Sequence, residues 1–234
     1  MTRSKNILIG ITLTASTLFA GVAQASRVDW NMCYDTTTSV ARKQFKDYPA
    51  LARSSVLEFI APGDRLAILR VDDLDVISVQ LESRLSRFEP QVTKIFKDIK
   101  EIPQNKRNDT VSDFVAIFDH ARQQIELNEK ANGSKGAKYV LVCIADGVQD
   151  KKSKPTESKT QRGTIAADYR ILFVGIHKGV EDALTKMAAE AGFTDQKKIL
   201  LVPFEHAGQV DVAAFLGRSR NPSAVKALGQ VGPN

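Results

Sequence analysis

The chain alternates between short apolar runs and longer segments in which apolar residues recur at helical spacing. Apolar runs, or apolar residues at every second position, predict strands over residues 28–34, 65–71, 76–81, 139–145, 171–176 and 199–204. Spacings of three and four predict helices over residues 49–60, 88–99, 110–125, 180–191 and 210–216. The run 139–145 has almost no polar position, which is typical of a strand covered on both faces.

This order of elements predicts an α/β fold with a mainly parallel sheet, because strands alternate with helices. Residues 72–75 form a polar turn between two strand-like runs, which indicates a hairpin. The chain shows no internal repeat and no linker. We therefore expect one domain over residues 26–222, followed by a C-terminal tail over residues 223–234.

The first 25 residues have the pattern of a secretory signal peptide. Arg3 and Lys5 precede an uncharged apolar stretch that ends in Ala23-Gln24-Ala25. We expect cleavage after Ala25 and a periplasmic or secreted mature chain; the alternative is a retained membrane anchor. No later run is long and apolar enough to span a bilayer, so we expect no stable membrane span in the mature form.

Composition narrows the chemistry further. The chain carries a net charge of +6, and two of the positive charges lie in the signal segment, so the mature chain is mildly basic and nucleic acid is not expected as a partner. Three dispersed histidines and two cysteines do not suit a zinc centre. Cys33 and Cys143 each lie in an apolar run, which favours buried free thiols.

The polar residues that follow the predicted strands are the candidates for chemistry, because ligands of such sheets bind beyond the carboxyl ends of the strands. Asp35, Thr37 and Ser39 follow the first strand, and Asp146 follows the strand 139–145. Thr110 begins a predicted helix. Carboxylates and hydroxyls without imidazole or thiolate suit a hard cation such as Mg²⁺, with Mn²⁺ or Ca²⁺ as alternatives.

These residues resemble a known family. Asp35-x-Thr37-x-Ser39 is similar to the D-x-S-x-S segment of von Willebrand factor A (VWA) domains, which hold a metal-ion-dependent adhesion site. The segment from Val140 to Gly147 is similar to the strand of that family that ends in T-D-G. The resemblance covers most of the mature chain and suggests a bacterial exported member. It implies a doubly wound, mainly parallel sheet with helices on both faces and one antiparallel edge strand.

The resemblance also implies a role for each site residue. Thr37 and Ser39 would bind the metal through their hydroxyls, Thr110 would supply a third hydroxyl, and Asp35 and Asp146 would orient bound waters. One coordination position would stay open for a carboxylate of a protein partner. The chain departs from the family pattern because Thr38 and Val40 replace a glycine and a methionine, and because Asp109 precedes Thr110 where a glycine is usual.

The leading hypothesis is a non-enzymatic, exported protein-interaction domain that binds an exposed Asp or Glu of its partner through a divalent cation. Basic residues after Asp146 would form a rim that favours such a partner: Lys151, Lys152, Lys154, Lys159 and Arg162. One alternative is a metal-free scaffold of the same fold in an envelope assembly. The other is an exported metal-dependent hydrolase, although Ser39 has no evident histidine partner.

Overall fold

The computed structural model describes residues 27–37, 40, 42–71, 76–105, 112–132, 137–149 and 162–231. Its strands are β1 (Val28–Tyr34), β2 (Arg65–Arg70), β3 (Val76–Gln80), β4 (Lys138–Ile144), β5 (Tyr169–Ile176) and β6 (Ile199–Pro203). Its α-helices are α1 (Arg42–Ala52), α2 (Leu85–Asn105), α3 (Phe114–Asn132), α4 (Glu181–Glu190), α5 (Val212–Leu216) and α6 (Pro222–Gly229). Shorter turns are the π-helical η1 (Arg53–Leu57) and the 3₁₀ turns η3 (Gln196–Lys198) and η4 (Phe204–His206).

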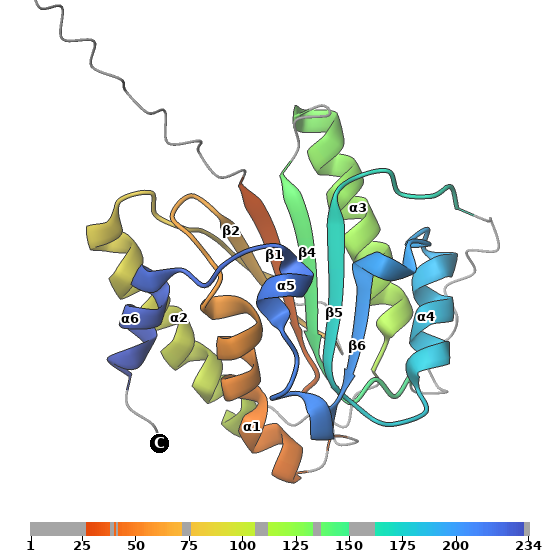
Figure 1. Cartoon of the computed structure of the whole chain (residues 1–234), viewed down its shortest axis with the longest axis horizontal. Coiled ribbons are helices and arrows are strands. Elements are labelled where there is room, and N and C mark those ends of the chain that lie inside the picture. Colours follow the sequence, from red (N-terminus) through yellow and green to blue (C-terminus); the bar gives the residue numbers. More distant parts are fainter. Residues whose placement is uncertain are drawn as a thin grey trace, which may run out of the picture.

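The described strands form one six-stranded sheet in the order β3-β2-β1-β4-β5-β6. All neighbouring pairs are parallel except β2 and β3, which form the hairpin at one edge (Figure 1). The order confirms the predicted doubly wound α/β class with one antiparallel edge strand. It also places the switch point between β1 and β4, since the chain winds outward from these two central strands in opposite directions.

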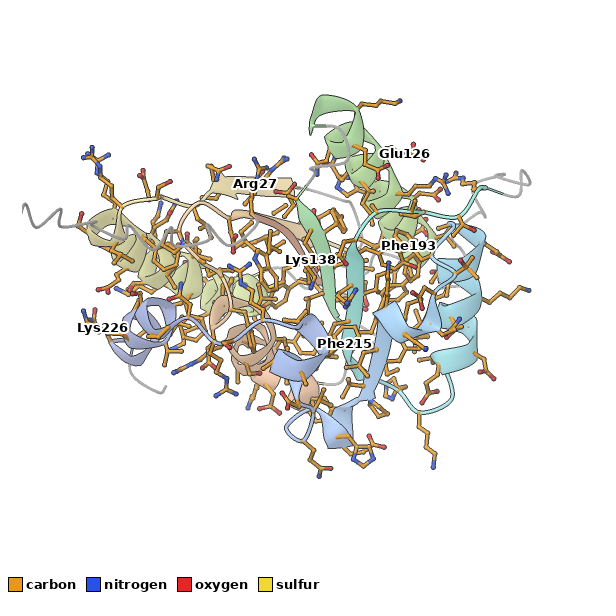
Figure 2. All side chains as sticks on the ribbon, turned by 45° about the horizontal axis from the view of Figure 1, so that its top comes forward. Arg27, Glu126, Lys138, Phe193, Phe215 and Lys226 are labelled. Atoms are coloured by element: carbon orange, nitrogen blue, oxygen red, sulfur yellow. The ribbon has the colours of Figure 1, made fainter. Side chains whose placement is uncertain are left out.

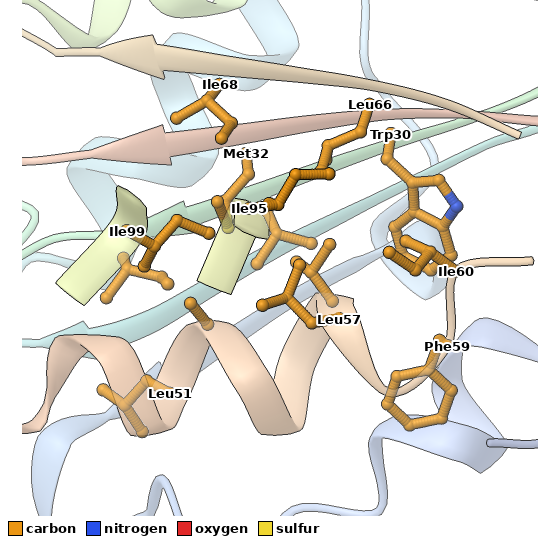
Figure 3. Packing of buried hydrophobic residues seen from close by; sticks show 14 of the residues in the cluster. Trp30, Met32, Leu51, Leu57, Phe59, Ile60, Leu66, Ile68, Ile95 and Ile99 are labelled. Atoms are coloured by element: carbon orange, nitrogen blue, oxygen red, sulfur yellow. The ribbon is translucent and has the colours of Figure 1, made fainter. Parts of the chain in front are cut away.

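Helices cover both faces of the sheet and enclose two apolar cores. On one face, Trp30 and Met32 of β1 share one apolar core with Leu51 of α1 and Ile95 of α2 (Figure 3). Helices α5 and α6 complete this core. On the other face, α3 and α4 pack on the sheet, and Phe193 lies beside them, whereas Phe215 lies on α5 (Figure 2). The site residues at the strand ends are therefore held by two well-packed layers.

The alternation in β1 explains how a strand with polar positions lies in the middle of the sheet. Trp30, Met32 and Tyr34 point into one core, and Cys33 points into the other. Asp29 is buried on the second face, where its carboxylate accepts hydrogen bonds from Arg27 at 2.8 Å and from Asn128 of α3 at 2.7 Å. The buried charge is thus hydrogen-bonded internally, as a buried carboxylate requires.

The predicted elements needed correction at three places. The first helix begins at Arg42 and continues into η1, so it starts before the predicted residue 49. Helix α2 continues through Pro103 to Asn105, whereas we expected it to end before that proline. The domain boundary at residue 222 was wrong, because α6 packs on α2 and its residues Ala224, Ala227 and Leu228 are fully buried.

None of the helices in the described part of the chain combines the length and the apolar character that crossing a membrane requires.

Candidate metal site at the switch point

Two buried aspartates lie at the carboxyl ends of the two central strands. Asp35 directly follows the last residue of β1, and Asp146 is separated from the last residue of β4 by Ala145. Both aspartates are fully buried. The Asp35 backbone N–H donates to the Ile144 carbonyl at 3.1 Å, so the β1–β4 pairing continues to the site itself. In doubly wound sheets, ligands bind beyond the carboxyl ends of the strands at the switch point, which is where these two aspartates lie.

Two hydroxyl side chains surround the Asp35 carboxylate. Oδ1 accepts hydrogen bonds from the Thr37 backbone N–H at 3.0 Å and from Thr37 Oγ1 at 2.6 Å. Oδ2 accepts a hydrogen bond from Ser112 Oγ at 3.3 Å, and Ser112 Oγ lies 3.1 Å from Thr37 Oγ1. Asp35, Thr37 and Ser112 therefore form a compact cluster of oxygen atoms, and all three are buried.

Asp146 completes the cluster from the neighbouring strand. Its Oδ1 accepts a hydrogen bond from the Val148 backbone N–H at 2.9 Å. Its Oδ2 is buried and has no hydrogen-bond partner among the described residues. Gly147 then turns the chain at a φ of 76°, and a Cβ there would lie 2.9 Å from Val180. The glycine is therefore required both by its conformation and by the close approach of the segment that leads into α4.

The loop that carries Asp146 is attached to the start of α3. Gln149 accepts a hydrogen bond from the Phe114 backbone N–H at 2.8 Å, and Asp113 accepts one from the Ala116 N–H at 3.1 Å. Both bonds satisfy N–H groups that the first turn of a helix leaves unpaired. They also hold Ser112, which directly precedes Asp113, at a defined position beside Asp35.

The burial of this cluster changes its acid–base properties. Burial raises the pKa of Asp35 to about 6, and the nearby charge of Asp146 contributes in the same direction, while hydrogen bonds from Thr37 and Ser112 oppose the shift. A bound divalent cation would lower the pKa of Asp35 again, because its positive charge would compensate the negative charges of Asp35 and Asp146.

Two buried tyrosines belong to the surroundings of the carboxylates. The rings of Tyr34 and Tyr48 are 6.2 Å apart, and both residues are fully buried. Burial raises the pKa of both phenols well above its usual value, and the charges of Asp35 and Asp146 add to the shift at Tyr48. Tyr48 of α1 is a neighbour of the site that the sequence did not reveal, because helical spacing reports burial and not proximity to a particular loop.

The predicted site residues divide into two groups. The structure brings Asp35, Thr37 and Asp146 together. Ser39, Thr110, Lys151, Lys152, Lys154 and Lys159 lie outside the described residues. Ser112 is a site residue that the sequence reasoning missed. The sequence held a signal for it, because Ser112 directly precedes Asp113, which is a preferred residue type at a helix start.

Arg162 is the one predicted rim residue within the described part of the chain. Its guanidinium makes two hydrogen bonds to the Asp119 carboxylate of α3, and its side chain is only 24% exposed. This ion pair holds the segment before β5 against α3. Arg162 therefore has a structural contact that the prediction of a partner-binding rim did not include.

The donor set restricts which ion could bind. The described residues hold no group of three His, Cys, Asp or Glu side chains that could coordinate a metal. A cation at this site would use two carboxylates, at least two hydroxyls and water. Mg²⁺ is the ion that this set fits best, because it keeps several waters and binds few carboxylates. The buried and unpartnered Oδ2 of Asp146 is consistent with this fit.

Comparison with known proteins adds little beyond the architecture. No family model and no curated protein matches the chain. Among solved structures, proximal thread matrix protein 1 from the mussel byssus is similar over 82% of this chain and 47% of that chain, with 13% identity and a TM-score of 0.49. The ArnB paralog VWA2 from Sulfolobus acidocaldarius is similar over 83% of this chain and 46% of that chain, with 16% identity and a TM-score of 0.43.

The human COPII-coat protein Sec24c is similar over 82% of this chain and 31% of that chain, with 9% identity and a TM-score of 0.44. The chain thus spans less than half the length of each of these three proteins. These values are too low to transfer a function or a ligand. The fold class therefore rests on the strand order, and the site rests on its own residues.

Proposed function

We propose that this chain is an exported, non-enzymatic protein-interaction domain of the VWA type, which binds an acidic residue of its partner through a divalent cation. The cation, Mg²⁺ in the first instance, would be held by the cluster around Asp35 and Asp146. Thr37 and Ser39 would supply hydroxyls from the loop after β1. The pattern of residues 1–25 supports export to the periplasm or the exterior.

The observation that carries this proposal is the arrangement of Asp146 beside the Asp35 cluster. Two fully buried carboxylates lie at the switch point of the sheet, and Asp146 Oδ2 has no hydrogen-bond partner among the described residues. A buried carboxylate oxygen without a partner is costly unless a cation or water satisfies it. Two carboxylates leave a divalent cation with ligand positions to fill, and an acidic side chain is a suitable ligand.

Ser112 is proposed as the third hydroxyl of the site, beside or in place of Thr110. Its Oγ already lies within hydrogen-bond distance of both Thr37 and Asp35. Thr110, which the family resemblance suggested for this role, precedes it by two residues. The two assignments differ in their predictions for mutants: the protein would lose cation affinity on substitution of Ser112 in one case and of Thr110 in the other.

A metal-free scaffold remains the second candidate, and one observation favours it. Thr37 Oγ1 donates to Asp35 at 2.6 Å, and Ser112 Oγ donates to the same carboxylate. These hydroxyls therefore already satisfy the Asp35 carboxylate without an ion. In this case the polar cluster would act as a structural cap at the strand ends.

Titration calorimetry with Mg²⁺, Mn²⁺ and Ca²⁺ separates the two candidates. We expect the wild-type protein to bind at least one of these ions, and Asp146→Asn to remove binding while the protein stays folded. Asp168→Asn is the matched control, because Asp168 is 60% exposed at the start of β5, at the opposite end of the sheet. Absence of binding to all three ions by the wild type would leave the scaffold as the remaining candidate.

A further inference from the structure

The two edges of the sheet differ in character. At the β3 edge, the exposed polar side chains Ser78 and Gln80 flank the partly buried Val79; Arg65 of β2 donates to Ser78, and Gln80 donates to the Gly63 carbonyl. At the β6 edge, the strand Ile199–Pro203 contains no charged side chain. Edge strands are usually protected by charges or by a covering element, because their unpaired backbone groups can pair with another strand.

Apolar side chains that are only partly buried gather around β6. On one face of the sheet these include Leu200, Phe204 and Phe215, and on the other face they include Ile199 and Leu201. Figure 1 shows β6 as the outermost strand, and within the described residues it pairs only with β5. The partly buried apolar side chains and the backbone groups that do not pair with β5 therefore coincide at one edge.

The charges that flank β6 are opposite in sign at its two ends. Lys197 precedes the strand in η3, and Glu205 follows it in η4; both residues are exposed. Neither side chain makes an ion pair with the described residues. An antiparallel pairing of β6 with β6 of a second copy, centred on Leu201, would bring η3 of each copy, which carries Lys197, to the end of the strand at which η4 of the other copy carries Glu205. The edge is thus complementary to itself, as a two-fold interface requires.

We propose that the β6 edge is a self-association surface, at which two copies of this chain pair antiparallel across a two-fold axis at Leu201. The pairing forms one continuous sheet through the two subunits and covers the partly buried apolar side chains around β6. Pro203 has no N–H, so the pairing is confined to the five residues of the strand. This surface is distinct from the switch-point cluster, and the proposal does not depend on cation binding.

Sedimentation velocity on the purified product of the full-length gene tests this interface. We expect a dimer for the wild type. Lys197→Glu and Glu205→Lys should each raise the dimer dissociation constant about tenfold, because each places two like-charged pairs at the interface. The double variant Lys197→Glu/Glu205→Lys restores both pairs with exchanged signs and should return to within about threefold of wild type. Both residues are exposed, so the variants should fold.

Lys130→Glu serves as the control, because Lys130 is an exposed lysine at the end of α3 and lies outside the proposed interface. Its dimer dissociation constant should equal that of the wild type. A wild-type protein that remains monomeric at about 0.1 mM overturns the proposal. The proposal is equally overturned if such a monomer pairs its β6 strand with a strand of a different protein. A dimer that is insensitive to both single reversals, or that the double variant does not restore, also overturns it.

Discussion

Ser112 Oγ lies 3.1 Å from Thr37 Oγ1, although 75 positions separate the two residues in the sequence. The contact joins the loop after β1 to the segment that begins α3, and both side chains meet at the Asp35 carboxylate. This three-residue arrangement places two hydroxyls of the described residues beside the Asp35 carboxylate at the switch point.

The first prediction separates Ser112 from Thr110 as the third hydroxyl. Ser112→Ala should weaken Mg²⁺ binding about tenfold, the loss expected for one oxygen ligand or its hydrogen bond. Thr110→Ala should leave the affinity within about twofold of wild type. Calorimetric titration of both variants provides the measurement. The reverse ranking would return the role to Thr110.

The second prediction concerns pH. The pKa of Asp35 is about 6 in the folded chain, above its value in an unfolded chain, so the folded protein binds more protons between about pH 4 and pH 6. In the presence of a chelator, the free energy of unfolding should therefore fall by about 2 kcal/mol as pH rises from 4 to 7 because of this group. Urea unfolding measures this difference.

Asp35→Asn provides the control for the pH effect, because it keeps the shape of the side chain and removes the titrating group. The variant should lose this contribution to the pH dependence and should be more stable than wild type at pH 7 without metal. Mg²⁺ should bind the wild type more tightly above pH 6, since the ion competes with a proton at Asp35. The same slope in both proteins would show that another group titrates.

The third prediction concerns the two thiols. Cys33 and Cys143 lie directly opposite each other in the β1–β4 register; both are free and fully buried. Burial raises the pKa of the Cys143 thiol well above its usual value, which disfavours the reactive thiolate. We expect no alkylation of the native protein and complete alkylation after unfolding. A purified chain about 2 Da lighter than the reduced mass would instead indicate a disulfide.

The fourth prediction concerns Asp64, which is buried and connects three parts of the chain. Its carboxylate accepts hydrogen bonds from the Val28 backbone N–H, from Trp30 Nε1 at 3.0 Å and from Arg218 at 2.8 Å. Asp64→Ala should lower the free energy of unfolding by about 3–5 kcal/mol, because it leaves a partly buried guanidinium and three N–H donors, of Val28, Trp30 and Ala61, without their acceptor.

The exposed ion pair at Asp168 is the comparison for this variant. Asp168 pairs with Arg170 at 3.2 Å and is 60% exposed, so Asp168→Ala should change the free energy of unfolding by less than about 1 kcal/mol. Denaturant unfolding of both variants measures the difference. Equal losses in the two proteins would contradict the central role of Asp64.

The fifth prediction separates Arg162 from the lysines of the preceding segment. The two hydrogen bonds to Asp119 should make Arg162→Ala destabilising by about 1 kcal/mol. Lys151→Ala should leave the stability within about 0.5 kcal/mol of wild type, because the proposed rim gives this lysine a role in partner binding and not in folding. Thermal unfolding of the two variants tests this. Equal stability of Arg162→Ala and wild type would show that the ion pair contributes nothing measurable.

The class of fold followed from local patterns. The almost unbroken apolar run before Asp146 predicted a strand covered on both faces, and its β4 residues Val140–Ile144 are indeed buried. The turn at residues 72–75 predicted the antiparallel pair that β2 and β3 form. Such patterns are reliable because burial on one or two faces imposes a period on the residues themselves.

The ends of elements were less predictable. Pro103 indicated the end of a helix, yet α2 continues past it. Residues 223–234 were predicted to be a tail, although most of α6 lies in this range and is buried against α2. Small residues such as Ala224 and Ala227 carry a weak apolar signal. Their burial depends on the close approach of another helix, which no local pattern reports.

By itself, the sequence determined that Asp35 and Asp146 follow two apolar strands, and that the chain forms an α/β sheet. Only the tertiary structure decided that these strands are neighbours at the switch point, that Ser112 reaches Thr37, and that Arg162 pairs with Asp119. The physical reason is the range of the interactions. Strand and helix periodicity arises within a few residues, whereas the contacts of a site join loops whose positions depend on how whole elements pack.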